Sequence, residues 1–137
     1  MKRQIVVEAV IEPMPQPRQK IGNRRAYLPE NHPVHGYKSA IRAAAARVMR
    51  GRRPIPDGVP MSVEFVFVMK RPKSYPKSSV ATPHILESAD CDNLQKAVQD
   101  ALIGVVYERD GAIWRWSGSK MHAPTGAGAS VKITIRF

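Results

Sequence analysis

Cysteine and long apolar runs are nearly absent from this chain of 137 residues. Its single cysteine, Cys91, excludes an internal disulfide and a cluster of thiolate metal ligands. No apolar run approaches the roughly 18–20 residues that a membrane-spanning helix needs. The basic N-terminus is followed by a segment that Glu8 and Glu12 interrupt too early for a signal peptide. We therefore expect a soluble, cytoplasmic protein with no membrane partner, folded as one domain over residues 1–137.

Acidic residues are also scarce, and they are unevenly distributed. The chain has 11 Asp and Glu against 22 Lys and Arg, for a net charge of +11, which favours a polyanionic partner with nucleic acid first. Between residues 87 and 110, however, six acids accompany only two bases, so this window carries −4 and the rest of the chain +15. The six acids are Glu87, Asp90, Asp92, Asp100, Glu108 and Asp110. Oxygen ligands for a divalent cation are the simplest explanation of such clustering.

Apolar patterning predicts a mixture of strands and helices. Runs rich in β-branched residues, or alternating at period two, predict strands at residues 4–11, 61–69, 112–121 and 129–137. Apolar spacings of three and four predict helices at residues 34–50 and 92–102. The strand at 61–69 should be central in its sheet, and residues 124–128 should form a hairpin between the last two strands. The expected fold is α/β (α+β): a mixed β-sheet of about four strands packed by two main helices.

Two proline-flanked loops collect basic residues. The candidate DNA-binding residues of these loops are Lys20, Arg24, Arg25, Lys70, Arg71, Lys73, Tyr75 and Lys77. Either loop can be a solvated connector or an arm that contacts phosphates, and Tyr75 could stack on an unpaired base. His84, alone in its own loop, is expected to act neither as a ligand nor as a phosphate donor.

The start of the second predicted helix carries the candidate chemistry. In an extended approach Asp90 and Asp92 point the same way because they are two residues apart. Asp92 then stands at the helix start with Gln95 three residues later, as in a capping box. Three carboxylates that converge repel one another unless a cation lies between them, and Mg²⁺ takes such oxygen ligands. Hydrolysis of a phosphodiester is a reaction that uses this ion.

A purely structural interpretation of the same residues is also open. In it Asp92 only caps the helix, and Lys96 bridges Asp92 and Asp100 one turn away on either side. Asp110 then only begins a turn with Gly111. Each of these roles is common, but together they leave the gathering of acids in a basic chain unexplained.

The pattern Asp-x-Asp-Asn-Leu-x-Lys-Ala-x-x-Asp-Ala-Leu at residues 90–102 resembles the motif of the RusA family of Holliday junction resolvases. The resemblance extends through residues 104–107 and Ile113, while the strand and the Lys/Pro/Ser loop upstream are similar only in kind. It implies that Asp90, Asp92 and Asp110 bind Mg²⁺, with Mn²⁺ as the alternative ion. It also implies that Lys96 is required for cleavage, through the scissile phosphate or the attacking water.

One position departs from the family pattern. Family members commonly carry an Asp-Asp pair at the third site, whereas this chain has Arg109 before Asp110. Aligning Asp110 with the metal-binding member keeps the spacing from Gly104 and the match at Ile113. With the alignment shifted, Glu108 becomes the candidate instead.

The resemblance further implies a Mg²⁺-dependent, structure-selective endodeoxyribonuclease that resolves four-way junctions by paired symmetric nicks. Recombination and DNA repair in a bacterium, phage or prophage are the implied setting, with a homodimer as the active form and no organic cofactor. A two-fold dimer would supply the two equivalent sites that paired nicks require. Two alternatives stay open: a non-catalytic basic DNA-binding or architectural protein, and a metal-dependent nuclease acting on flaps or RNA.

Overall fold

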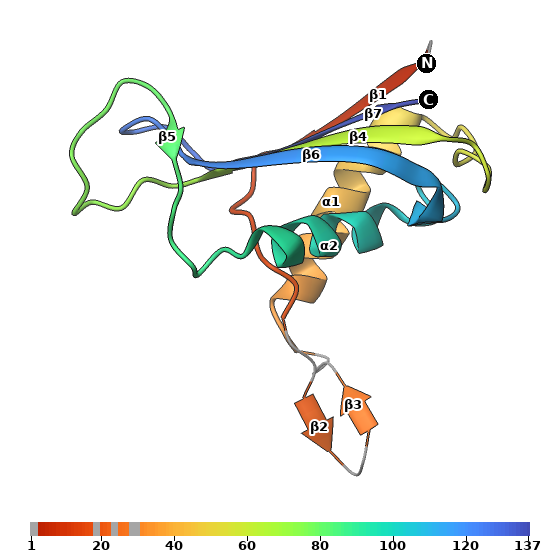
Figure 1. Ribbon diagram of the computed structural model, residues 1–137, viewed down its shortest axis with the longest axis horizontal. Helices are drawn as coiled ribbons and strands as arrows, with labels where there is room; N and C mark the ends of the chain where they lie inside the picture. Colours follow the sequence, from red (N-terminus) through yellow and green to blue (C-terminus); the bar gives the residue numbers. More distant parts are fainter. Residues whose placement is uncertain (1–2, 18–19, 23–24, 28–30) are drawn as a thin grey trace.

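A mixed five-stranded sheet with two helices on one face forms the body of the molecule (Figure 1). The computed structural model describes residues 3–17, 20–22, 25–27 and 31–137. The sheet strands, in spatial order, are β1 (Gln4–Ala9), β7 (Ser130–Arg136), β4 (Met61–Met69), β6 (Ile113–His122) and β5 (Thr82–Pro83). The helices are α1 (Val34–Met49) and α2 (Cys91–Leu102), and a short 3-10 helix, Asp110–Ala112, precedes β6. Two short strands, β2 (Lys20–Gly22) and β3 (Arg25–Tyr27), pair with each other apart from this sheet.

The central position predicted for the 61–69 strand is confirmed. β4 pairs antiparallel with β7 on one side and parallel with β6 on the other. Its alternate residues, from Met61 to Met69, are buried against the helices, whereas Glu64 on the opposite side is exposed. The predicted α+β class, with a mixed sheet and two main helices, is confirmed as well.

Both helices cover the same face of the sheet and contact each other. α1 presents Tyr37, Ile41 and Ala45 to the core, where the small alanine allows close approach. Arg42 of α1 donates a hydrogen bond from Nε to the carbonyl of Ala101, 2.9 Å away, and so satisfies an acceptor in the last turn of α2. Neither helix, in the part of the chain that the structure describes, has the length and apolar content to cross a membrane.

The hairpin predicted between the last two strands is wrong. β6 and β7 do not pair with each other, because β4 lies between them in the sheet. Residues 124–128 do turn, with the N–H of Ala127 bonded to the carbonyl of Pro124 at 3.0 Å, but the connection passes β4 and does not join paired strands. Strand pairing is a non-local property, and a Gly-rich connection does not reveal which strands it brings together.

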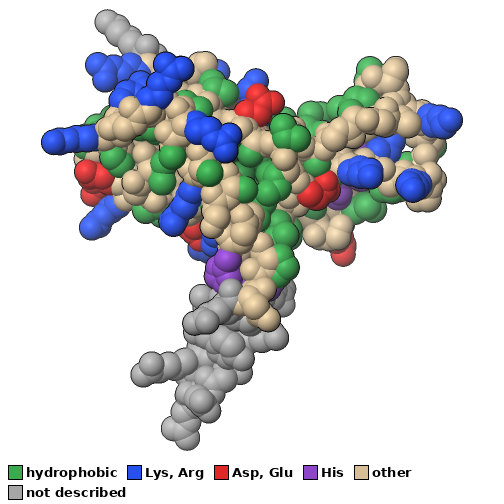
Figure 2. All heavy atoms as spheres, turned by 180° about the vertical axis from the view of Figure 1, so that it is seen from behind, with side chains coloured by type: hydrophobic (Ala, Val, Ile, Leu, Met, Phe, Trp, Pro, Cys, Tyr) green, Lys and Arg blue, Asp and Glu red, His purple; other side chains and the backbone are tan. Residues whose placement is uncertain are grey.

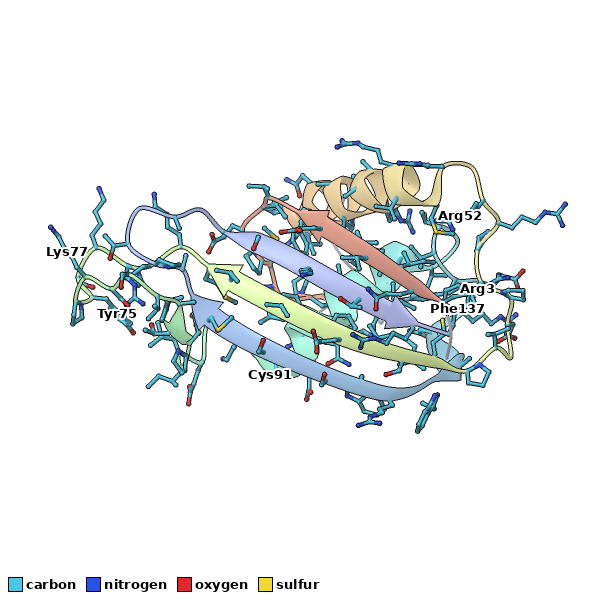
Figure 3. All side chains as sticks on the ribbon, turned by 90° about the horizontal axis from the view of Figure 1, so that it is seen from above. Arg3, Arg52, Tyr75, Lys77, Cys91 and Phe137 are labelled. Atoms are coloured by element: carbon cyan, nitrogen blue, oxygen red, sulfur yellow. The ribbon has the colours of Figure 1, made fainter. Side chains whose placement is uncertain are left out.

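One edge of the sheet is largely uncovered. β5 pairs only with Met121 and His122 at the end of β6, so no described strand pairs with the outer edge of β6 between Ile113 and Ser119. A register irregularity between β4 and β6 skips Trp114. Figure 3 looks onto the sheet face that the helices leave open, with β6 along its edge.

Candidate active site between α2 and β6

Asp90 is the residue that starts α2. Its backbone is extended, and its Oδ1 accepts a hydrogen bond from the backbone N–H of Asp92 at 3.1 Å. The prediction that Asp92 is the cap is therefore wrong: Asp92 lies in the first turn, with its own side chain left for other contacts. A carboxylate in the first turn is stabilised by the helix dipole.

A groove separates the exposed side of α2 from β6. Two adjoining hollows of about 410 and 310 Å³ make it up, and they share Asp92, Gln95 and Trp116. The larger hollow is completed by Gln99, Asp110 and Ile113. The smaller one is lined further by Phe67, Cys91, Leu94 and residues 117–120. We call the two together the α2–β6 groove. Asp92 and Asp110 both line its larger hollow although they come from different elements.

The turn after α2 returns the chain to the groove at Asp110. Gly104 has a positive φ of 83°, and its N–H bonds the carbonyl of Tyr107 at 2.7 Å. The hydroxyl of Tyr107 donates to the carbonyl of Gln99 at 2.9 Å and so joins the turn to α2. Burial, followed by the nearby carboxylates of Asp110 and Asp100, raises the pKa of Tyr107, so its hydroxyl stays protonated as a donor.

The two carboxylates of the groove are not neutralised by a basic side chain. In the described part of the chain, neither Asp92 nor Asp110 has an ion-pair partner within 4 Å. Lys96 does not bridge Asp92 and Asp100 as the structural interpretation predicted; Asp100 pairs instead with Lys38 of α1 at 3.8 Å. Lys96 is exposed on α2, one turn from Asp92.

Asp110 and Glu108, the two candidates for the third acidic position, lie in different surroundings. Asp110 lines the groove, whereas Oε2 of Glu108 accepts a hydrogen bond from the backbone N–H of Asp57 at 3.0 Å. Arg109 lies 3.9 Å from the carboxylate of the same Asp57. Both residues are thus directed to the loop before β4 and not to the groove.

The side chains that line the groove suit a Mg²⁺ ion that takes only one or two ligands from the protein. No three His, Cys, Asp or Glu side chains converge as a metal cage within the described residues, so the expected convergence of Asp90 with the other two acids is not seen there. Mg²⁺, however, is commonly held by one or two carboxylates and completes its octahedron with water. Asp92 and Asp110 are two carboxylates that could hold such an ion, and the amides of Gln95 and Gln99 line the same hollow.

Lys120 joins the groove to the segment that precedes α2. Its ammonium donates to the carbonyls of Leu86 at 3.0 Å and of Ala89 at 2.7 Å. These two bonds attach the chain before Asp90 to β6, and Lys120 itself lines the smaller hollow. Lys120 is therefore a positioning residue for the start of α2, which the sequence did not reveal.

The loop after β4 carries the second group of candidate DNA contacts (Figure 3, Tyr75 and Lys77 labelled). The lysines of this loop are Lys70, Lys73 and Lys77, all exposed. They surround a hollow of about 410 Å³ together with residues 124–127. Figure 2 shows Lys and Arg side chains gathered over this end of the molecule, at the right of the view. The guanidinium of Arg71 donates hydrogen bonds within the protein, to the carbonyls of Ala123 and Pro76 and to the hydroxyl of Thr82.

Tyr75 and His84 pack together around His122. The ring centroids are 4.9 Å apart for Tyr75–His122 and 4.3 Å apart for His84–His122. His84 is only 7% exposed and His122 only 2%. His84 is therefore part of a small ring cluster that closes the base of the loop.

The first basic loop can be placed only in part. Arg24 lies outside the described residues, and of Lys20 and Arg25 the structure gives the backbone in β2 and β3 but not the side chains. The segment before that loop runs beside the first turn of α2, where the N–H of Gln16 bonds the carbonyl of Asn93 at 2.8 Å. The loop therefore leaves the body of the protein close to Asp92.

Trp116, Gln95 and Gln99 are groove residues that the motif did not single out. The helical spacing of 92, 95 and 99 was a usable signal, because residues three and seven apart share one face. Trp116 had a weaker signal, since aromatic residues make up only 7% of the chain and two tryptophans lie two residues apart.

Comparison with known proteins identifies the class of molecule that has this fold and groove. The family model for Endodeoxyribonuclease RusA matches residues 11–136, nearly the whole chain. The protein is thus an endodeoxyribonuclease by class. It belongs to the RusA family, whose activity is on Holliday junctions. No curated protein matches the chain in a sequence comparison.

Proposed function

We propose that this protein is a Mg²⁺-dependent, structure-selective endodeoxyribonuclease that resolves four-way junctions by paired nicks in recombination and DNA repair. The observation that carries the proposal is the meeting of Asp92 and Asp110 in the α2–β6 groove of a chain with net charge +11. Two unneutralised carboxylates would repel a DNA phosphate, whereas a cation held between them would attract it. The opposite signs of the groove and of its surroundings are what a metal-dependent nuclease requires.

Asp92 and Asp110 would hold the ion, and Asp90 would support them. When bound, Mg²⁺ neutralises charge on the scissile phosphate and stabilises the leaving oxygen. Asp90 keeps Asp92 in the first turn through the cap, because its Oδ1 accepts a hydrogen bond from the backbone N–H of Asp92. Mn²⁺ would substitute, because it accepts the same oxygen ligands.

Lys96 would act on the substrate side of the groove. Its ammonium is exposed one turn beyond Asp92 and has no ion-pair partner within 4 Å among the described residues. A cation in that position can contact the scissile phosphate or orient the attacking water. Either role stabilises charge that grows in the transition state.

DNA away from the cut would lie along the basic loops. Lys70, Lys73 and Lys77 extend around one hollow and are not paired with acids in the described structure. Arg71 and Tyr75 would shape this loop from within, given their contacts to Thr82 and His122. A homodimer would place two such assemblies on the two strands that a junction presents.

The experiment uses a synthetic four-way junction, with and without Mg²⁺, and three proteins: the parent, Asp92→Asn and Asp100→Asn. Asp100 is the matched control, because it lies on the same helix but pairs with Lys38 outside the groove. We expect Asp92→Asn to bind the junction at least as tightly as the parent and to leave it uncut, while Asp100→Asn still cuts. A protein that binds the junction and never cuts it would be an architectural DNA-binding protein. Preferential cutting of flaps or RNA would assign the groove to another substrate.

A further inference from the structure

The two tryptophans of the chain lie on one strand, but only Trp116 lines the α2–β6 groove. Trp114 and Trp116 are 59% and 58% exposed, so their exposure alone does not distinguish them. Trp116 lines the α2–β6 groove beside Asp92 and Asp110. Trp114 lines another hollow with Ser62, Glu64 and Arg136 on the open face of the sheet, and Trp116 lines that hollow as well.

More than half of the surface of Trp116 is accessible at the groove. Two residues further along the same side of β6 stands Gly118, which has no side chain and lines the smaller hollow. The outer edge of β6 at this point has no partner strand among the described residues. A large flat ring is therefore held at the mouth of the groove, next to the carboxylates.

The charge around this ring favours a nucleic acid. The chain carries a net charge of +11, which attracts DNA toward the groove. Arg115 is exposed next to Trp116 on the strand and lines the second hollow that Trp116 also lines. A nucleotide presents a phosphate to cationic groups and a flat base to an aromatic ring.

We propose that Trp116 stacks on an unpaired nucleobase next to the phosphodiester that the metal ion held by Asp92 and Asp110 would bind. The inference rests on the proposed function for the location of that phosphodiester. In a duplex both faces of a base are covered by its neighbours, so only a base displaced at a branch point or in a single strand can reach the indole. Trp116 would thus make the groove selective for branched over fully paired DNA.

Intrinsic fluorescence tests the stacking directly, because each single substitution leaves one tryptophan as reporter. Trp114→Phe reports on Trp116, and Trp116→Phe reports on Trp114. Each is titrated, with Ca²⁺ in place of Mg²⁺ to suppress cutting, against a thymidine oligonucleotide, a four-way junction and a blunt duplex. We expect the oligonucleotide and the junction to quench Trp116 strongly, with weak quenching by the duplex and weak quenching of Trp114 by all three. Equal quenching of the two reporters, or none of Trp116, would overturn the proposal.

Cleavage kinetics provide the second measurement. Trp116→Leu should raise KM for the junction about tenfold, the size expected for one lost base stack, with kcat nearly unchanged. Trp116→Phe should recover most of the loss, and Trp114→Leu should behave as the parent. Unchanged KM in Trp116→Leu would contradict the stack while leaving the nuclease assignment intact. Conversely, a protein that never cuts could still show quenching of Trp116. Failure of the stacking proposal and failure of the proposed nuclease function would therefore give different results.

Sedimentation in the absence of DNA tests whether a second copy of the chain, and not DNA, covers Trp116. Trp116→Leu and the parent should have the same oligomeric state at the same concentration. If the substitution changes that state, the indole belongs to a contact between copies and the proposal is overturned.

Discussion

The hydroxyl of Tyr107 donates a hydrogen bond to the carbonyl of Gln99, 2.9 Å away. This bond links the turn that leads to Asp110 to the middle of the helix that carries Asp92, whereas the backbone bonds from Val105 and Val106 reach only Leu102 at the helix end. Since Tyr107 is only 1% exposed, its ring also packs under both elements. The relative position of the two groove carboxylates therefore depends on a residue that touches neither the proposed metal nor the DNA.

Replacing Tyr107 with Phe removes that bond and keeps the ring. We expect the free energy of unfolding to fall by about 1 kcal/mol, the usual size of a neutral hydrogen bond. The Mg²⁺ concentration that gives half-maximal cleavage should rise, because Asp110 is held less firmly. Urea unfolding and a Mg²⁺ titration measure the two effects. Loss of stability with an unchanged Mg²⁺ requirement would show that the bond does not position Asp110.

Replacing Lys120 with Met removes the donor that holds residues 86–89 against β6. Since hydrogen bonds from charged groups are stronger than neutral ones, we expect a loss of about 2 kcal/mol in stability. Because those residues lead into Asp90, half-saturation by Mg²⁺ should again shift upward. Lys132→Met, an exposed change on β7, is the control and should alter neither quantity. Identical behaviour of the two variants would remove Lys120 from the site.

The histidine cluster predicts how stability depends on pH. Burial, then the positive charge of Arg71, lowers the pKa of His122 below its usual value of 6.5. Burial, then His122 and Lys120, lowers the pKa of His84. The unfolded chain therefore binds more protons than the folded one below about pH 6.5. Stability should be insensitive to these groups above that pH and should fall as the pH drops through 6.5 toward the folded-state values.

His122→Phe tests this assignment. Neither ring nitrogen of His122 has a hydrogen-bond partner in the described structure, so an apolar ring should be tolerated there. Thermal unfolding followed from pH 8 to pH 5 should show a smaller decrease in Tm on acidification than in the parent. A decrease as steep as that of the parent would place the pH sensitivity elsewhere.

Lys96 should affect the chemical step more than binding. We expect Lys96→Met to cut the junction about 10²–10³ times more slowly, the range seen when a charge-stabilising donor is lost. Junction affinity should change little, because one exposed cation among 22 Lys and Arg is removed. Lys38→Met, which also removes one lysine but from the Asp100 pair, is the control. Single-turnover rates separate the two, and equal rates would contradict a role for Lys96.

The local patterns in the sequence predicted more of the fold than of the site. The alternation at 61–69 and the helical spacing at 92–102 reflect burial of one face, which a sequence displays directly. The hairpin between β6 and β7 was wrong because the insertion of β4 depends on contacts distant in the chain. Likewise, Lys38 and not Lys96 meets Asp100, because only the packing of α1 on α2 brings Lys38 near.

Of the three acids that the sequence singled out as metal ligands, Asp92 and Asp110 line one hollow and Asp90 does not. Asp90 and Asp92 are equally suited to cap a helix, and only the backbone shows that Asp90 takes this role. The meeting of Asp92 with Asp110 was expected from the family resemblance, and both line one hollow. Trp116 lies in the groove because β6 is at the edge of the sheet, and Lys120 bonds the carbonyl of Ala89 in the loop before α2. Both placements depend on contacts between segments distant in the chain, which no local pattern shows.

The most direct test of the account is a crystal structure of the protein soaked in Mn²⁺, examined by anomalous scattering. The account predicts an anomalous peak in the α2–β6 groove, within ligand distance of the carboxylates of Asp92 and Asp110. The peak should vanish in Asp92→Asn and persist in Asp100→Asn. A groove without a peak in the parent protein, or a peak that survives Asp92→Asn unchanged, would contradict it.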